Sequence, residues 1–301
     1  MREVASAPIG RDPDGVLVVD KPAGMTSHDV VDDIRRRFKT KKVGHGGTLD
    51  PDATGVLVVG LGRATRFLSY TQTSPKRYRA TARFGVTTTT QDSSGAVLAR
   101  RPADVTREQV VDAMTHFVGA IEQLPPMVSA VKVGGERLYK RARRGEEVER
   151  RARVVTITNC ELLEFRSGEL PEARIDVMCS SGTYVRTLIH DIGQVLGCGA
   201  HLASLRRTLA GGFSDAQAVA LERVDPSALR PVADAVRFLG VLQVDERIAR
   251  LARQGRAIDL AHADGERIGE GDVVSVVHGR ALVGVYRRRG SSLIPDRVVA
   301  K

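Results

Sequence analysis

Apolar runs and one alternating segment predict the strands in the first third of the chain. Gly15–Lys21 (GVLVVDK) and Val56–Val59 are short runs rich in Val and Leu, which are typical of buried strands. Lys76–Gly85 (KRYRATARFG) alternates apolar and polar residues, the period of a strand with one solvated face. Its two faces are Tyr78, Ala80, Ala82 and Phe84 on one side and Arg77, Arg79, Thr81 and Arg83 on the other.

Three segments carry apolar residues at helical spacing. The first is predicted to begin with Ser27 as its N-cap. The second follows Thr106, which together with Gln109 resembles a capping box. The third, residues 181–197, ends at Gly197, a residue suited to the C-terminal cap. The expected inward positions are Val30, Val31, Ile34 and Phe38, then Val110, Val111, Met114 and Phe117, and finally Val185, Leu188, Ile189, Ile192 and Leu196.

Further strands are predicted on both sides of residue 240. They are Val154–Ile157, Ala173–Met178, residues 201–208 (HLASLRRT), Val273–Val277 and Ala281–Tyr286. The last two flank residues 278–280 (HGR), which are typical of a hairpin turn. Because the character of the chain changes after Pro231, we place a domain boundary near residue 240. Residues 1–240 would form one large domain and residues 241–301 a small β-rich one.

Composition and charge narrow the class of protein. The chain has 301 residues, of which 42% are hydrophobic, enough for a sizeable core. It carries 46 Lys and Arg against 36 Asp and Glu, a net charge of +10 with a pI near 9.9. Such an excess favours an anionic partner such as nucleic acid, although a basic surface with no partner has the same composition.

Nothing in the sequence indicates a membrane segment or an exported protein. No apolar run approaches the roughly 18 residues that cross a bilayer. The first fifteen residues lack the apolar core of a signal peptide. Cys160, Cys179 and Cys198 lack metal-ligand spacing and are predicted to be reduced thiols. We therefore expect a cytoplasmic protein without membrane attachment.

The most charged stretch runs from Lys132 to Arg153. It holds nine basic and four acidic residues, and its apolar residues are too few for a core element. This pattern predicts a solvated surface insertion, about residues 125–153, whose cations are able to contact phosphate. The cations that we select for this contact are Lys132, Arg137, Lys140, Arg141, Arg143 and Arg144.

Asp50 lies in a Gly- and Thr-rich segment just before an apolar strand, and its chemistry is open to several interpretations. It could form an acid/base pair with Asp52, but paired carboxylates of that kind usually come from separate elements. It could bind a metal with His45 and Asp52, although no further ligand lies nearby in the sequence. It could cap the turn at Pro51, which composition alone favours. The glycines at 46–47 would let a ligand approach the backbone closely.

The order of residues around Asp50 adds a resemblance. Residues 44–66 (GHGGTLDPDATGVLVVGLGRATR) resemble the motif around the catalytic aspartate of the TruB family, bacterial tRNA pseudouridine synthases that act on uridine 55 of the T-loop. The resemblance spans roughly residues 16 to 215. It extends to VDKPAGMTSHDVV, KRYRATARFGVTTTTQDSSG, QLPPMVSAVKVGGERLYKRARRGE, CSSGTYVRTLIHDIG and HLASLRRT.

The resemblance implies a fold of the α+β class. We expect a mixed, mostly antiparallel central sheet of the pseudouridine-synthase type with flanking helices. The insertion at about residues 125–153 would be an RNA-gripping thumb. The C-terminal residues 241–301 would be a small β-rich RNA-binding domain of the PUA type.

The resemblance also assigns the catalytic roles. It implies that uridine is isomerised to pseudouridine after the base has been flipped out of the RNA. Asp50 would be the nucleophile, and Arg186 would form an ion pair that keeps its carboxylate ionised. Tyr78 would stack on the flipped base and is a candidate base for the final proton removal. From the strand pattern alone, Tyr78 is equally well explained as a core aromatic residue.

Four further residues would contact the substrate or support the site. The resemblance assigns His45 to the space that the flipped base vacates, and Tyr184 and Leu205 to the uracil pocket. A core leucine would have the same pattern as Leu205. Lys21 would support the Asp50 segment or bind a phosphate.

The expected partner is tRNA, bound by its T-arm to a monomer. The isomerisation calls for no cofactor and no metal. The alternative function is a tRNA-binding or RNA-folding protein with little or no catalytic turnover. The presence of both Asp50 and Arg186 favours the enzyme.

Overall fold

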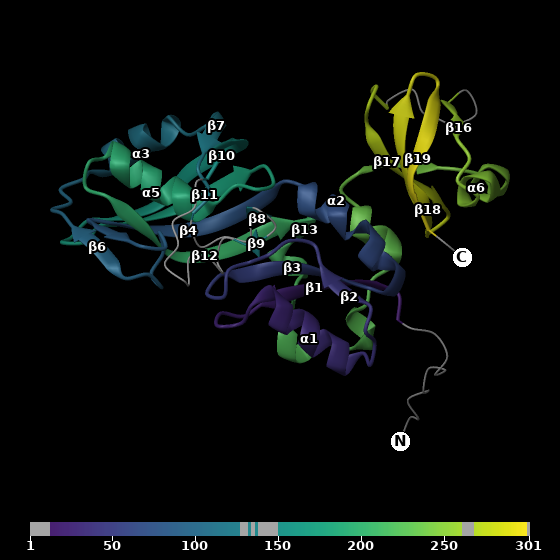
Figure 1. The fold of residues 1–301 in the computed structure, drawn as a ribbon, viewed down its shortest axis with the longest axis horizontal. Helices are drawn as coiled ribbons and strands as arrows, with labels where there is room; N and C mark the ends of the chain where they lie inside the picture. Colours follow the sequence, from purple (N-terminus) through teal and green to yellow (C-terminus); the bar gives the residue numbers. More distant parts are fainter. Residues whose placement is uncertain (1–12, 127–131, 134–135, 138–149, 261–267, 300–301) are drawn as a thin grey trace.

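The computed structural model describes residues 13–126, 132–133, 136–137, 150–260 and 268–299. It has two β-rich parts, a large one with flanking helices and a small one at the C-terminal end (Figure 1). Of the selected thumb cations, Lys132 and Arg137 lie on the short paired strands β8 (Lys132–Val133) and β9 (Glu136–Arg137). Lys140, Arg141, Arg143 and Arg144 lie outside the described residues.

The large part is built on one ten-stranded sheet of order β14-β1-β3-β12-β4-β11-β10-β7, with β2 paired to β3 and β13 to β12. Only the pairs β1–β14 and β12–β3 are parallel, so the sheet is mixed and mostly antiparallel, as expected. Its strands are β1 (Gly15–Lys21), β2 (Val43–His45), β3 (Thr54–Leu61), β4 (Lys76–Phe84), β7 (Gly119–Gln123), β10 (Arg153–Arg166), β11 (Glu172–Cys179), β12 (Ala200–Ala210), β13 (Phe213–Ser214) and β14 (Val219–Ala220).

The strand predictions for this sheet are confirmed. Strand β1 has the predicted bounds, and β4 alternates as expected, with the face that carries Tyr78 and Phe84 buried. The predicted segments Val154–Ile157 and 201–208 are parts of the longer strands β10 and β12.

Strand β12 joins the two halves of the sheet. It lies between β3 and β4, so that Arg207 is opposite Gly55 on one side and Tyr78 on the other. A Cβ atom on Gly55 would lie 2.2 Å from the carbonyl oxygen of Arg207, so only glycine permits this approach. The approach brings the start of β3 beside the middle of β4.

Helix α1 (Ser27–Arg37) packs against one half of the sheet, and α3 (Arg107–Thr115) and α5 (Val185–Val195) pack against the other half (Figure 1). The prediction that Ser27 caps α1 is wrong. Thr26 is the N-cap and forms a capping box with Asp29, while the Ser27 hydroxyl bonds the backbone of Leu49. The predicted capping box of Thr106 and Gln109 is confirmed.

Two details of the helix predictions need correction. Val111 is not inward: it is 39% exposed, because the buried face of α3 passes through Val110 and Met114. Helix α5 begins at Val185 rather than at residue 181. Gly197 follows the C-cap in a left-handed conformation, as predicted.

The remaining elements of the large part are short. They are η1 (Gly62–Phe67), α2 (Leu68–Thr73), β5 (Val86–Thr88), β6 (Val97–Arg100), η2 (Asp215–Gln217), η3 (Leu221–Arg223), η4 (Pro226–Ala228) and η5 (Val232–Val236). Across the described ranges, no helix combines the length and the apolar character needed to cross a bilayer.

The small part is a five-stranded sheet with one helix and its own core. Its elements are β15 (Gly240–Gln243), α6 (Glu246–Arg253), β16 (Ile258–Asp259), β17 (Val273–His278), β18 (Ala281–Arg289) and β19 (Ser292–Val298). The two predicted strands and the hairpin between them are confirmed. The second sheet begins at Gly240, which supports the predicted domains 1–240 and 241–301, a division that stays a prediction.

Candidate active site

Asp50 lies in the connection between β2 and β3, which we call the Asp50 loop (residues 46–53). The loop is held at its start by a hydrogen bond from the Gly46 amide to the Val58 carbonyl (2.8 Å). In its middle, the Ser27 hydroxyl both donates to the Leu49 carbonyl and accepts from the Leu49 amide. Past Pro51, the Ala53 amide closes a turn onto the Asp50 carbonyl (3.1 Å). These contacts give the loop a defined backbone around the carboxylate.

Asp50 and Arg186 form the expected ion pair. The Nε of Arg186 lies 3.1 Å from one carboxylate oxygen of Asp50, and its Nη2 lies 3.3 Å from the other. Such a fork fixes the direction of a carboxylate as well as its charge. The Arg186 side chain is only 4% exposed, whereas Asp50 keeps 43% of its surface. The carboxylate therefore sits at the opening of the site with its cation behind it.

Arg186 also holds a second carboxylate, which the sequence did not indicate. Its Nη1 lies 3.2 Å from Asp92 and donates to the carbonyl oxygen of Thr90 (3.2 Å). Arg186 lies in the first turn of α5, where the helix dipole disfavours a cation. Two carboxylates more than offset this effect. The signal for Asp92 was weak, because "DSSG" also has the composition of an ordinary turn.

The charges around Asp50 oppose one another. Desolvation by burial raises the pKa of Asp50 above its ordinary value, Arg186 lowers that pKa, and the nearby Asp92 raises it. The guanidinium is thus what favours the ionised form of a carboxylate whose surroundings disfavour charge.

Tyr78 lies on β4 within the main hydrophobic cluster, together with Leu49 and Ala53 of the Asp50 loop. Burial raises the pKa of Tyr78, the Arg207 cation opposes that rise, and the charge of Asp50 adds to it. The structure therefore brings the phenol near the carboxylate while it also fills the core. Leu205 is partly buried against the same cluster, opposite Ala80.

Tyr184 is the N-cap residue of α5 and is fixed through its backbone. Its amide donates to the side chain of Gln123 (2.7 Å), which in turn donates to the Tyr184 carbonyl (3.0 Å). The guanidinium of Arg153 lies 4.7 Å from the centre of the Tyr184 ring. Gln123 is a buried supporting residue that the sequence did not single out.

Lys21 supports the Asp50 loop and does not contact solvent. Its ammonium donates to the carbonyl oxygens of Pro22 (2.8 Å), Met25 (2.6 Å) and Pro51 (2.8 Å). Burial lowers the pKa of Lys21 to about 8, against the opposing charges of Asp52 and Asp50. The side chain is 0% exposed, so the expectation that Lys21 binds a phosphate is wrong and the expectation that it supports the loop is confirmed.

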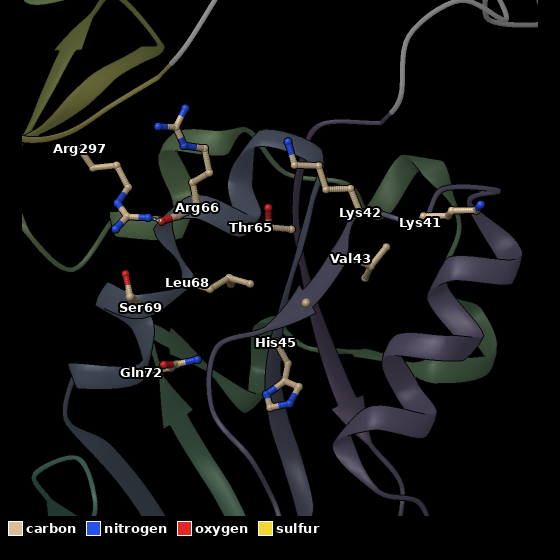
Figure 2. A pocket seen from close by; sticks show the side chains of 11 residues that line it. Lys41, Lys42, Val43, His45, Thr65, Arg66, Leu68, Ser69, Gln72 and Arg297 are labelled. Carbon is tan, nitrogen blue, oxygen red and sulfur yellow. Dashed lines mark hydrogen bonds between the residues drawn. The ribbon is translucent and has the colours of Figure 1, made fainter. Parts of the chain in front are cut away.

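His45 ends β2 and faces a groove between the large and small parts, which we call the interdomain groove. The groove has a cavity volume of about 540 Å³. Figure 2 shows Arg66 and Arg297 on one side of it, Lys41 and Lys42 on the other, and His45 at its lower end. The Gly47 amide donates to Nδ1 of His45 (3.3 Å), and the ring of His28 meets the His45 ring edge-on.

The metal interpretation of Asp50 finds no support in the geometry. Among the residues that the structure describes, no three His, Cys, Asp or Glu side chains are placed to hold one ion. The cysteines are free thiols, and burial raises the pKa of Cys160 to about 12 and of Cys179 to about 11.

Comparison with known proteins connects this arrangement to a family. The model of the N-terminal domain of TruB family pseudouridylate synthases matches residues 35–185, and that of the tRNA pseudouridylate synthase B C-terminal domain matches residues 186–235. A protein named tRNA pseudouridine synthase B from Symbiobacterium thermophilum is 53% identical over 247 residues, 81% of this chain and 83% of that protein. One of the same name from Thermobifida fusca is 52% identical over 230 residues, 74% and 78% of the two chains.

Solved structures agree with the sequence relatives. A chain from the crystal structure of a Cbf5-Nop10-Gar1 complex is 28% identical with a TM-score of 0.74, covering 95% of this chain and 84% of that one. A chain from an H/ACA RNP bound to a substrate RNA containing 2'-deoxyuridine is 25% identical with a TM-score of 0.72, covering 95% and 85%. The chain belongs to the TruB family of pseudouridylate synthases and is an isomerase of that kind.

Proposed function

We propose that this chain converts uridine 55 in the T-loop of tRNA to pseudouridine, with Asp50 as the nucleophile. The observation that carries the proposal is the Asp50 carboxylate, which is directed outward by a buried Arg186 fork in a chain of the pseudouridylate synthase family. Relatives about half identical to this chain are named tRNA pseudouridine synthase B, which supports tRNA as the substrate.

The isomerisation places one demand on each residue of the site. The target base must leave the folded RNA, since its reacting atoms are otherwise out of reach. Asp50 then adds to the substrate; a carboxylate suits attack either on the anomeric carbon or on the base. The N-glycosidic bond breaks, the uracil turns, and a bond forms from its carbon to the sugar. Tyr78 stacks on the base and accepts the proton that this carbon loses, while Arg186 keeps Asp50 ionised.

The interdomain groove and the thumb supply the charge for the RNA backbone. The groove brings Lys41, Lys42, Arg66 and Arg297 together beside His45, within a chain of net charge +10. Contacts of this kind position RNA, and the shape of the T-loop provides specificity. Tyr184 and Leu205 would line the uracil pocket, and the thumb cations would grip the T-arm. We expect the protein to act as a cytoplasmic monomer.

The test uses an unmodified tRNA transcript and a matched pair of variants. Asp50→Asn keeps the shape of the side chain and removes the nucleophile, so we expect turnover to fall by about 10⁴-fold or more. The dissociation constant for tRNA should stay within about twofold, because binding rests on the basic surfaces. Asp52→Asn, two residues away on the same loop, should keep turnover near that of the parent.

The measurement is pseudouridine formed at position 55, mapped in the RNA product. If Asp50→Asn turns over at the parent rate, Asp50 is not the nucleophile. If pseudouridine forms at another position, the site assignment is wrong. If the parent binds tRNA without forming pseudouridine, the chain is an RNA-binding protein of the alternative kind.

A further inference from the structure

Arg207 is a buried cation beneath the candidate active site, and it has no part in the mechanism above. It is only 1% exposed and is among the largest fully buried side chains of the protein. Among the described residues it makes no ion pair with a carboxylate. Burying a cation without a carboxylate is costly unless other acceptors satisfy its donors. Its surroundings must therefore supply these acceptors.

The acceptors are backbone carbonyls of the Asp50 loop and of the strand that follows. Nη2 donates to the Gly47 carbonyl (3.1 Å) and Nη1 to the Thr48 carbonyl (3.3 Å). Nε donates to the Val56 carbonyl (2.8 Å), just after the loop. One rigid planar group thus ties both ends of the loop that carries Asp50. Side chains with one donor atom cannot reproduce this three-point contact.

The position of Arg207 in the sheet makes this contact possible. On β12 it lies opposite Gly55 on one side and Tyr78 on the other. Its charge is also the largest influence that opposes the burial-driven rise in the pKa of Tyr78. A single cation therefore adjoins both the loop of the proposed nucleophile and the proposed base.

We propose that Arg207 is a positioning residue for catalysis: by holding the carbonyls of Gly47, Thr48 and Val56, it fixes the direction in which Asp50 leaves its loop. Arg207 itself touches no substrate. The inference rests on the proposed function of Asp50. A purely structural arginine would, when replaced, lower stability without a separate loss of the catalytic step.

The test compares Arg207→Lys with Arg206→Lys. Lysine keeps the charge at position 207 but loses the planar fork. Arg206, the next residue on the strand, is partly exposed and pairs with Asp20 and Asp215, so it serves as a matched control. For each variant we would measure the single-turnover rate of pseudouridine formation, the dissociation constant for tRNA and thermal unfolding, with Asp50→Asn alongside.

We expect Arg207→Lys to unfold cooperatively, to bind tRNA within about twofold of the parent, and to react about 100-fold more slowly, the scale of a small misplacement of a catalytic group. Arg206→Lys should react within about threefold of the parent. A folded Arg207→Lys that reacts within threefold of the parent, or that loses tRNA binding instead of rate, overturns the inference. An active Asp50→Asn would sink the proposed function independently of this result.

A second variant tests the same contact from the loop and is informative even if Arg207→Lys does not fold. Gly47 has a φ of +141°, a conformation that side chains rarely adopt. Gly47→Ala should therefore move the Gly47 carbonyl away from the guanidinium while Arg207 stays in place. We expect the same selective loss of rate with tRNA binding retained. A parent-like rate for Gly47→Ala would overturn the inference whatever happens to Arg207→Lys.

Discussion

Asp50 depends on the balance between burial, which raises its pKa, and Arg186, which lowers it. Its ionised form is the nucleophile in the proposed function, so the reaction should slow as pH falls through that pKa. Arg186→Met removes the lowering influence, and the acid limb of the pH–rate profile should move to higher pH. The rate at its plateau should also fall by at least 100-fold, because the fork no longer directs the carboxylate. Single-turnover rates between pH 5 and 8 measure both effects.

Asp92 provides the opposite test. Its negative charge raises the pKa of Asp50, so Asp92→Asn should move the acid limb to lower pH than in the parent. The two variants alter the same network of charges with opposite sign. Shifts in the same direction, or no shift in either, would contradict this account of the site.

The sequence could indicate only some of these residues, for a physical reason. Asp50, Arg186 and Tyr78 lie in motifs that a resemblance identifies locally. Asp92 and Arg207 become important through their neighbours in space, which lie about a hundred residues or more away along the chain. Local pattern cannot show which distant partner a polar side chain will meet. Thr26 was missed for a smaller reason, because Thr and Ser are both good N-caps.

At the scale of elements, Lys76 ties the end of α2 to the start of β4. Its ammonium donates to the carbonyl oxygens of Thr71, Gln72 and Ser74, and burial lowers its pKa to about 8 from 10.5. Between these two pH values the unfolded chain holds a proton that the folded chain has released. The contribution of Lys76 to folding stability should therefore rise with pH from about 8 to about 10.5.

Lys76→Met isolates this effect, because the other titrating groups are common to the parent and the variant. We expect the unfolding free energy of the parent, minus that of the variant, to increase as pH rises from 8 toward 10. Urea unfolding at pH 7.5, 8.5 and 9.5 measures the difference. A difference that stays flat across this range would show that the ammonium is as well stabilised in the folded protein as in water.

Elements themselves were largely predictable, while their arrangement was not. Period-two alternation identified β4, and short apolar runs identified β1 and β3, because burial acts residue by residue on these patterns. The insertion of β12 between β3 and β4 follows from Gly55 and from long-range pairing, neither of which leaves a periodic signal. The mixed topology of the sheet came from the family resemblance alone.

At the scale of the whole molecule, the two β-rich parts are in direct contact. Tyr70 donates to Asp296 (2.6 Å), and Arg297 donates to the backbone carbonyl of Arg66 (2.7 Å). Apolar residues of both parts share one cluster beside these bonds; Phe67 and Val236 come from the large part, and Val277, Leu282 and Val285 from the small one. The walls of the interdomain groove are therefore held in fixed relation. A groove of fixed width suits a substrate that arrives already folded, as tRNA does.

The groove makes a prediction about salt. Lys41 and Lys42 are exposed and line it, so a Lys41→Ala/Lys42→Ala variant should bind tRNA about tenfold more weakly. Each lost phosphate contact releases fewer counterions, so the slope of log affinity against log salt should become shallower by about 1.5. The rate at saturating tRNA should not change, because neither lysine reaches the Asp50 loop in the contacts described above.

An Arg100→Ala/Arg107→Ala variant removes the same charge from a distant surface. These arginines are exposed on β6 and at the start of α3, at the opposite end of the large part from α2 and the groove (Figure 1). If net charge alone governs binding, both double variants will lose affinity and salt dependence equally. If the groove holds the RNA backbone, the loss will be confined to the lysine pair, since screened charges beyond about 10 Å contribute little at 0.1 M salt. Equal losses would therefore remove the groove from the path of the RNA and leave its steering to the overall field of the protein.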